Sequence, residues 1–101
     1  MAETKKRINE ELLRELREIP VGDTVTELTQ RAAILVLLGQ NFASLSREFE
    51  REGKLEEAHE CYETAVGLYK EAIELCKKAN VPDLVKRYEK GLQLIEERFK
   101  P

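Results

Sequence analysis

The sequence contains few of the residues on which catalytic and metal-binding sites usually depend. It has no tryptophan, one histidine and two cysteines among 101 residues. His59 stands three positions after Glu56, a spacing found in half of a di-iron carboxylate site, but such a site needs two of these motifs and further glutamates. One chain therefore lacks the ligands for it. We predict no metal, no cofactor and no enzymatic activity.

The two cysteines do not indicate a disulfide or a redox site. If Cys61 and Cys76 lie on one helix, their separation is about 22 Å, which is far beyond disulfide reach. Neither has a Cys-x-x-Cys partner or a neighbouring cation that would lower the pKa of its thiol. We expect both to be reduced core residues, in agreement with a cytoplasmic location.

The chain also lacks an excess of charge of one sign and a long apolar run. It has 20 acidic and 17 basic residues and a net charge of −3, which excludes the basic surface expected of a nucleic-acid-binding domain. The longest apolar run, AAILVLL, is much shorter than the roughly 20 residues that span a bilayer. No apolar segment follows the basic residues near the N-terminus, so we expect no secretory signal and no membrane insertion.

Proline and glycine are scarce, and they mark the breaks between helices. Pro20 and Gly22 form one break, Gly53 another, and Asn80 with Pro82 a third. The spacing predicts helices over 4–19, 23–52, 55–79 and 82–100, and the short connections make neighbours antiparallel. We therefore predict one domain, 1–101, an all-α antiparallel four-helix bundle in which 1–22 form an extra N-terminal helix and turn.

The second predicted helix is apolar on every side in its middle, so we expect it to be surrounded. Asn41 lies beside this stretch, where a half-buried amide would fix the register of neighbouring helices. Opposite the main apolar stripe lies a second strip, formed by Ala33, Leu37, Gln40 and Ser44. Either the first helix or a second copy of the protein would cover Leu37. The second alternative makes this strip a candidate homodimer surface.

The third predicted helix carries a sevenfold pattern. Alanines recur every seven residues beside a column of tyrosines and a cysteine, and this arrangement is typical of a closely packed core: Ala58, Ala65, Ala72, Ala79, Tyr62, Tyr69 and Cys76. The apolar arc of the helix is wider than one neighbouring helix would cover. The margin of that arc, along Cys61, Leu68 and Leu75, is therefore a candidate binding surface.

The stretch FASLSREFEREGKLEEAHECYETAVGLYKEA is similar to a tetratricopeptide helical hairpin. Over residues 32–100 the chain more closely resembles the microtubule-interacting and trafficking (MIT) domain, a three-helix bundle that extends such a hairpin. Domains of that family bind short peptide motifs of filament-forming ESCRT proteins, either as a helix or as an extended strand. The resemblance implies a peptide groove between the third and fourth helices, with Leu68 and Leu75 on one side and Leu92 or Leu94 on the other.

The sequence thus predicts a non-enzymatic module that binds a helical or extended peptide in an apolar groove between helices. The alternative is a self-associating or designed structural bundle that has no separate ligand. The sevenfold regularity of the third helix favours this alternative. Four residues are not typical of an idealised design and argue against it: Gln40, Asn41, His59 and Cys61.

Overall fold

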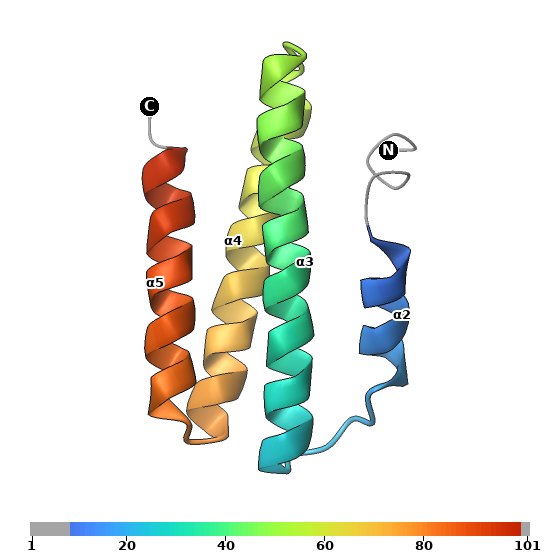
Figure 1. The fold of residues 1–101 in the computed structure, drawn as a ribbon, viewed down its shortest axis with the longest axis vertical. Coiled ribbons are helices and arrows are strands. Elements are labelled where there is room, and N and C mark those ends of the chain that lie inside the picture. The colour runs from blue at the N-terminus through green and yellow to red at the C-terminus, as the bar shows by residue number, and fades with distance from the viewer. Residues whose placement is uncertain (1–8, 100–101) are drawn as a thin grey trace.

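The computed structural model describes residues 9–99 of the chain and shows four α-helices joined by short connections (Figure 1). They are α2 (Glu10–Glu18), α3 (Val25–Arg51), α4 (Leu55–Lys78) and α5 (Pro82–Arg98). Successive helices run antiparallel, and no strand occurs among the described residues. The prediction of an all-α, antiparallel four-helix bundle is confirmed.

The helix ends follow the predicted local signals. Thr24 caps α3 in a capping box, in which its hydroxyl accepts from the Glu27 backbone N–H while the Glu27 carboxylate accepts from the Thr24 backbone N–H. Asn80 follows α4 with a φ of 59°, the left-handed conformation that ends many helices. Pro82 opens α5, where its fixed φ suits the first turn.

Asn9, which lies inside the helix predicted over 4–19, is the cap of α2 and is not helical. Asn9 has extended backbone and its side chain accepts from the backbone N–H groups of Glu11 and Leu12, at 3.0 and 3.3 Å. This cap sets the start of α2 at Glu10. The predicted start at residue 4 lies outside the described residues, as does residue 100, the predicted end of the last helix.

Tyr69 of α4 joins three helices at the centre of the core. A Cβ atom added to Gly39 of α3 would lie 2.8 Å from Tyr69 Cδ2, and one added to Gly91 of α5 would lie 2.9 Å from Tyr69 Cε1. The ring is therefore held between two glycines, and only the absence of both side chains leaves room for it. Around it packs a buried cluster of Ala32, Leu35, Val36, Ala72 and Cys76.

A second buried cluster fills the other end of the α3–α4 pair. Leu45 and Phe49 of α3 pack against Ala58 and Cys61 of α4, with Phe42 beside them. The buried Ser46 hydroxyl donates a hydrogen bond of 2.6 Å to the Ala58 carbonyl oxygen, so its burial leaves no unpaired hydroxyl. Of the two columns predicted for the core of α4, the alanines are buried, as are Tyr69 and Cys76, whereas Tyr62 is half-buried.

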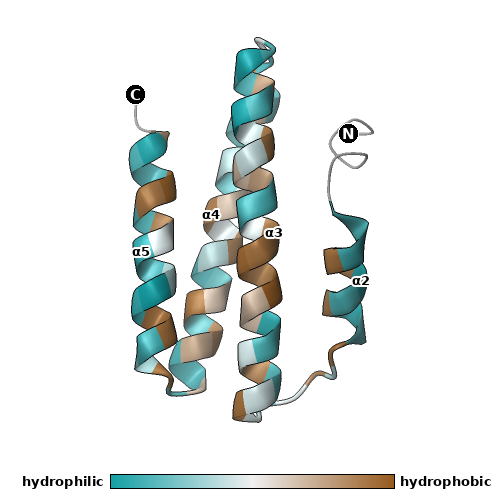
Figure 2. Cartoon of the chain, viewed as in Figure 1, coloured by the Kyte–Doolittle hydropathy of each residue, from teal (hydrophilic) through white to brown (hydrophobic). Residues whose placement is uncertain are grey.

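The helices stand side by side, and the molecule is flat. Its extents are 43 × 28 × 13 Å, and the main packing contacts join α2 with α3, α3 with α4, and α4 with α5. Figure 1 shows α2 and α5 on opposite sides of the α3–α4 pair. Helix α2 lies on the outside of the bundle, with its apolar segments turned toward α3 (Figure 2).

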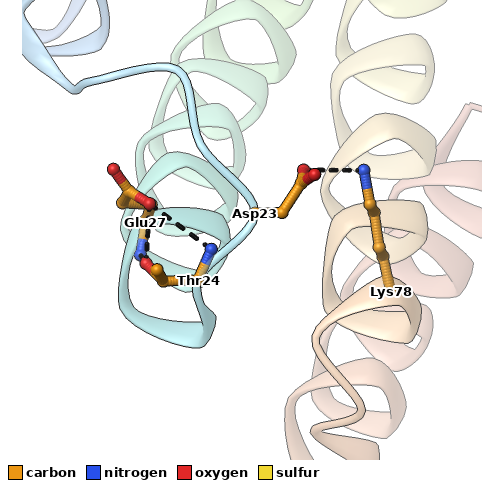
Figure 3. A network of polar contacts seen from close by, with 4 residues as sticks. All are labelled: Asp23, Thr24, Glu27 and Lys78. Atoms are coloured by element: carbon orange, nitrogen blue, oxygen red, sulfur yellow. Dashed lines mark hydrogen bonds and ion pairs between the residues drawn. The ribbon is translucent and has the colours of Figure 1, made fainter.

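Polar contacts tie the connection before α3 to the end of α4. The Lys78 ammonium lies 2.8 Å from the Asp23 carboxylate, although the two residues are 55 positions apart in the sequence (Figure 3). Both side chains are exposed, so the pair contributes at most about 1 kcal/mol. It lies beside the Thr24–Glu27 capping box, and together these contacts fix where α3 begins.

Candidate functional site

The residues predicted to line a peptide groove do not form one exposed surface. Cys61 is 3% exposed and packs against Phe49 and Leu45, so it belongs to the core instead of the margin of α4. Leu68, Leu75 and Leu92 are half-buried and pack against the central cluster. Leu94 is 58% exposed on the outer side of α5.

The orientation of α4 explains this arrangement. The side of α4 that meets α5 carries Tyr62, whose ring centroid lies 5.0 Å from that of Phe99, and Tyr69, which contacts Gly91. Because successive residues of a helix are about 100° apart, Leu68 and Leu75 lie about 100° and 120° around α4 from Tyr69. They therefore face away from the side on which α5 packs.

The strip predicted for self-association is exposed. Ala33, Leu37, Gln40 and Ser44 all face solvent, and Leu37 has 47% of its surface exposed. The prediction that the middle of α3 is surrounded is therefore wrong on this side. The reason is the position of α2, which packs on the neighbouring flank of α3 at Ile34 and Asn41 and leaves Leu37 uncovered.

This strip is part of a longer surface without charge. Every exposed residue of α3 from Thr26 to Ser44 is uncharged, whereas most exposed positions of α4 and α5 carry a charge. We call this surface the uncharged seam: Thr26, Gln30, Ala33, Leu37, Gln40 and Ser44. At about 1.5 Å per residue it is about 27 Å long. Its lack of charge is not explained by burial within the chain.

The charged residues that interrupt this part of α3 lie off the seam and bind the chain itself. Glu27 completes the capping box with Thr24. The Arg31 guanidinium donates a hydrogen bond of 3.3 Å to the Ile19 carbonyl oxygen at the end of α2. At the other end of α2, the Asn41 side-chain oxygen accepts from the Asn9 backbone N–H at 2.9 Å. Asn41 is half-buried, and it fixes the register of α2 on α3 as predicted.

A groove between α2 and α3 borders the seam. Its lining combines an apolar floor with acidic residues from α2, and it is formed by Ile19, Pro20, Ala33, Ile34, Gln30, Glu15 and Glu18. Its volume is about 440 Å³. Ala33 and Gln30 belong both to the groove and to the seam, so the two form one continuous surface. Sequence reasoning identified part of the seam but missed the groove.

A second concavity, also missed, lies at the open end of the α3–α4 pair. It is lined by Leu55, Ala58, His59 and Tyr62 of α4, Ser46 and Glu50 of α3, and Phe99 after α5. It arises because α5 has 17 residues, whereas α3 has 27 and α4 has 24. The last turns of α3 and the first turns of α4 therefore extend past α5. The unequal lengths predicted for these helices were the feature of the sequence that could have indicated this concavity.

The side chains that could take part in acid–base, redox or metal chemistry have structural roles. His59 Nε2 lies 2.8 Å from a Glu63 carboxylate oxygen on the exposed side of α4, and Glu56 is not its partner. Burial raises the pKa of the Cys76 thiol, which disfavours the reactive thiolate. Burial, with smaller contributions from nearby Cys76 and Tyr69, also raises the pKa of Tyr88. Between residues 9 and 99, no three His, Cys, Asp or Glu side chains form a group that could hold a metal ion.

Comparison of the chain with protein-family models, with curated proteins and with solved structures gives no match. The resemblance to the MIT and tetratricopeptide families therefore stays an expectation from the sequence. Among the described residues, no helix combines the length and apolar character needed to cross a membrane.

Proposed function

We propose that the protein is a non-enzymatic interaction module that binds an amphipathic helix of a protein partner in the groove between α2 and α3. One observation carries the proposal: the uncharged seam lies beside this groove on a surface that is otherwise densely charged. An unpaired apolar side chain such as Leu37 gains from contact with a partner, and an uncharged surface costs little to remove from water.

The groove also indicates the chemistry of the partner. Glu15 and Glu18 border its apolar floor and form no ion pair within residues 9–99. A partner helix with lysine or arginine beside its apolar face would be attracted to this border. The small Ala33 lets such a helix approach α3 closely. We therefore expect an uncharged helix face of small or aliphatic residues, flanked by basic ones.

This proposal places the binding groove elsewhere than the resemblance to the MIT family implies. The groove expected between α4 and α5 would need Leu68 and Leu75 on the side of α5, and they lie on another flank of α4. The function proposed for the α2–α3 groove is of the predicted kind: it binds a helix in a groove between two helices of the chain. It differs in the helices that supply the surface.

Titration of the isotope-labelled full chain with two synthetic helical peptides tests the proposal. Both peptides carry the same alanine–leucine face, flanked by lysines in one and by glutamates in the other. We expect the basic peptide to shift the amide resonances of Ala33, Leu37 and Gln40, with affinity roughly fivefold or more above that of the acidic peptide. The chain is kept at about 50 µM throughout, and dilution of the chain alone serves as the control for contacts between copies.

Two variants make this titration specific. Leu37→Glu should abolish the shifts caused by the basic peptide, whereas Leu94→Glu, at a leucine of similar exposure on α5, should leave them unchanged. Shifts confined to α4 and α5 would instead support the groove implied by the family resemblance. The absence of shifts along α3 with either peptide would contradict binding of a helix in this groove.

A further inference from the structure

We infer that the helix bound beside the seam is α3 of a second copy of the chain, so that the protein forms an antiparallel, two-fold symmetric dimer. This inference rests on the proposed function and names its partner. The seam of α3 supplies the uncharged face of small or aliphatic residues just described, and Arg47 and Arg51, which form no ion pair within the described residues, follow it at one end.

The spacing of the seam suits the packing of one helix against another. Its residues are separated alternately by four and three positions, from Thr26 through Gln30, Ala33, Leu37 and Gln40 to Ser44. This average of 3.6 is the repeat of a straight α-helix, so the seam stays on one face of α3 along its length. The order of the spacings is the same in both directions. The seam therefore matches a second copy of itself that runs antiparallel, as a two-fold interface requires.

Residues of similar chemistry meet when two seams are aligned in this way. With the two-fold axis between Ala33 and Leu37, Ala33 of each copy lies opposite Leu37 of the other and forms an apolar centre. Gln30 then lies opposite Gln40, and their side-chain amides can donate to and accept from each other. Thr26 lies opposite Ser44 at the ends, so hydroxyl meets hydroxyl. An apolar centre bordered by polar residues is the usual anatomy of a protein interface.

Charge selects the antiparallel orientation over the parallel one. In the antiparallel pair, Arg47 of one copy lies opposite the turn that holds Asp23 of the other, and the dipoles of the two helices oppose each other. A parallel pair would set Arg47 against Arg47 and Arg51 against Arg51. Like charges placed opposite each other repel. A parallel pair would also set the like ends of the two helix dipoles side by side, which is unfavourable.

The size of the surface predicts that the dimer is weak. A seam about 27 Å long on a helix about 10 Å wide gives roughly 300 Å² per copy, and α2 adds a similar strip at most. Stable interfaces bury about 800 Å² per partner. Because α2 is held between the levels of Arg31 and Asn41, the two copies of Glu15 would also lie near each other and repel. We therefore expect a dissociation constant of roughly 0.1 to 1 mM.

Sedimentation equilibrium of the full chain from about 10 µM to about 1 mM tests the dimer. The weight-average mass should rise from the 11.7 kDa of the monomer to at least about 1.3 times that value. Leu37→Glu should keep the mass of the monomer at every concentration, with unchanged helical circular dichroism. The matched control, Leu94→Glu, should associate like the unsubstituted chain. A constant monomer mass for the unsubstituted chain would overturn the inference.

Cysteine cross-linking tests the antiparallel alignment. In the double variant Gln30→Cys, Gln40→Cys, the two positions lie ten residues or about 15 Å apart on one helix, too far for a disulfide within a chain. Between copies they should oxidise to a covalent dimer. The native Cys61 and Cys76 are buried and should not compete. The single variant Gln30→Cys should not cross-link, and efficient cross-linking of that variant would show a parallel pair and contradict the alignment.

The two proposals fail in different ways. If the unsubstituted chain remains a monomer while the basic peptide shifts Ala33 and Leu37, the dimer is wrong and binding of a separate helix stands. If both the mass and the resonances stay constant, the seam binds no helix and both proposals are wrong. If the mass doubles but Leu37→Glu has no effect, the dimer uses another surface and the inference is wrong.

Discussion

The two sides of α3 share an absence of charge, but only one side is covered by the chain. On the side that faces α4, Leu35 and Ala32 are buried beside Tyr69. On the opposite side, Ala33 and Leu37 face solvent, only one or two positions away in the sequence. The comparison teaches that the apolar character of α3 has two causes. Packing within the chain explains the first side, and the proposed contact with another helix would explain the second.

The largest expected effect is a difference in the free energy of unfolding between variants of two leucines, one on each of these sides. Leu35→Ala should lower the free energy of unfolding by about 2 to 4 kcal/mol, because it removes buried contacts and leaves a cavity. Leu37→Ala should change it by less than about 0.5 kcal/mol in dilute solution, because its side chain is half in water. Urea denaturation at about 5 µM protein measures both values. Equal losses for the two variants would contradict the difference between the sides.

A smaller effect on stability should separate substitution of Gly39, which allows close helix packing, from substitution of Gly67, which does not. Gly39→Ala should destabilise the protein by about 1 to 2 kcal/mol in spite of the higher helix propensity of alanine, since the new Cβ meets the Tyr69 ring. Gly91 blocks the other edge of that ring, which limits its movement. Gly67→Ala is the matched control, because no atom lies within 4 Å of its Cβ position. It should stabilise the protein by about 0.5 to 1 kcal/mol. Stabilisation by both variants would show that Tyr69 can move aside.

The smallest expected effect is a pH dependence that belongs to the covered side alone. Burial raises the pKa of Cys76 and of Tyr88, so the folded state favours their protonated forms. The stability that each contributes is present below the pKa of the unfolded chain, about 8.5 for cysteine and about 10 for tyrosine. It is lost as the pH rises toward the folded-state pKa, because the unfolded chain releases these protons first.

Denaturation at a series of pH values from about 8 to 11 measures this decline. Cys76→Ala should flatten its lower part and Tyr88→Phe its upper part. The exposed side of α3 has no titrating group between Thr26 and Ser44, so Leu37→Ala should leave the slope unchanged. A steeper slope in Leu37→Ala would contradict the assignment of the pH dependence to the covered side.

The sequence predicted the fold because its local signals agree with its packing. Thr24 with Glu27, Asn80 and Pro82 mark helix ends by their own hydrogen bonding and backbone conformation, which do not depend on distant residues. The alanine and tyrosine columns of α4 identified its buried side for the same reason. The cap at Asn9 is a signal of the same local kind, and it was missed.

The candidate site was less predictable, because it depends on which flank of each helix is covered. Leu68 and Leu75 belong to the apolar arc of α4, but the arc alone does not say on which side α5 packs. The seam left a clearer signal, since residues 32–46 contain no charge in a chain with 37% charged residues. Its exposure depends on α2, which Asn41 and Arg31 hold on the neighbouring flank.

We propose above that the uncharged seam of α3 is a contact surface. The most direct test is to record the amide resonances of the isotope-labelled chain during dilution from about 1 mM to about 20 µM. We expect shifts that follow one binding curve at Ala33, Leu37 and Gln40, with none on the exposed sides of α4 and α5. Resonances along the seam that stay constant while the others shift, or a spectrum independent of concentration, would contradict it.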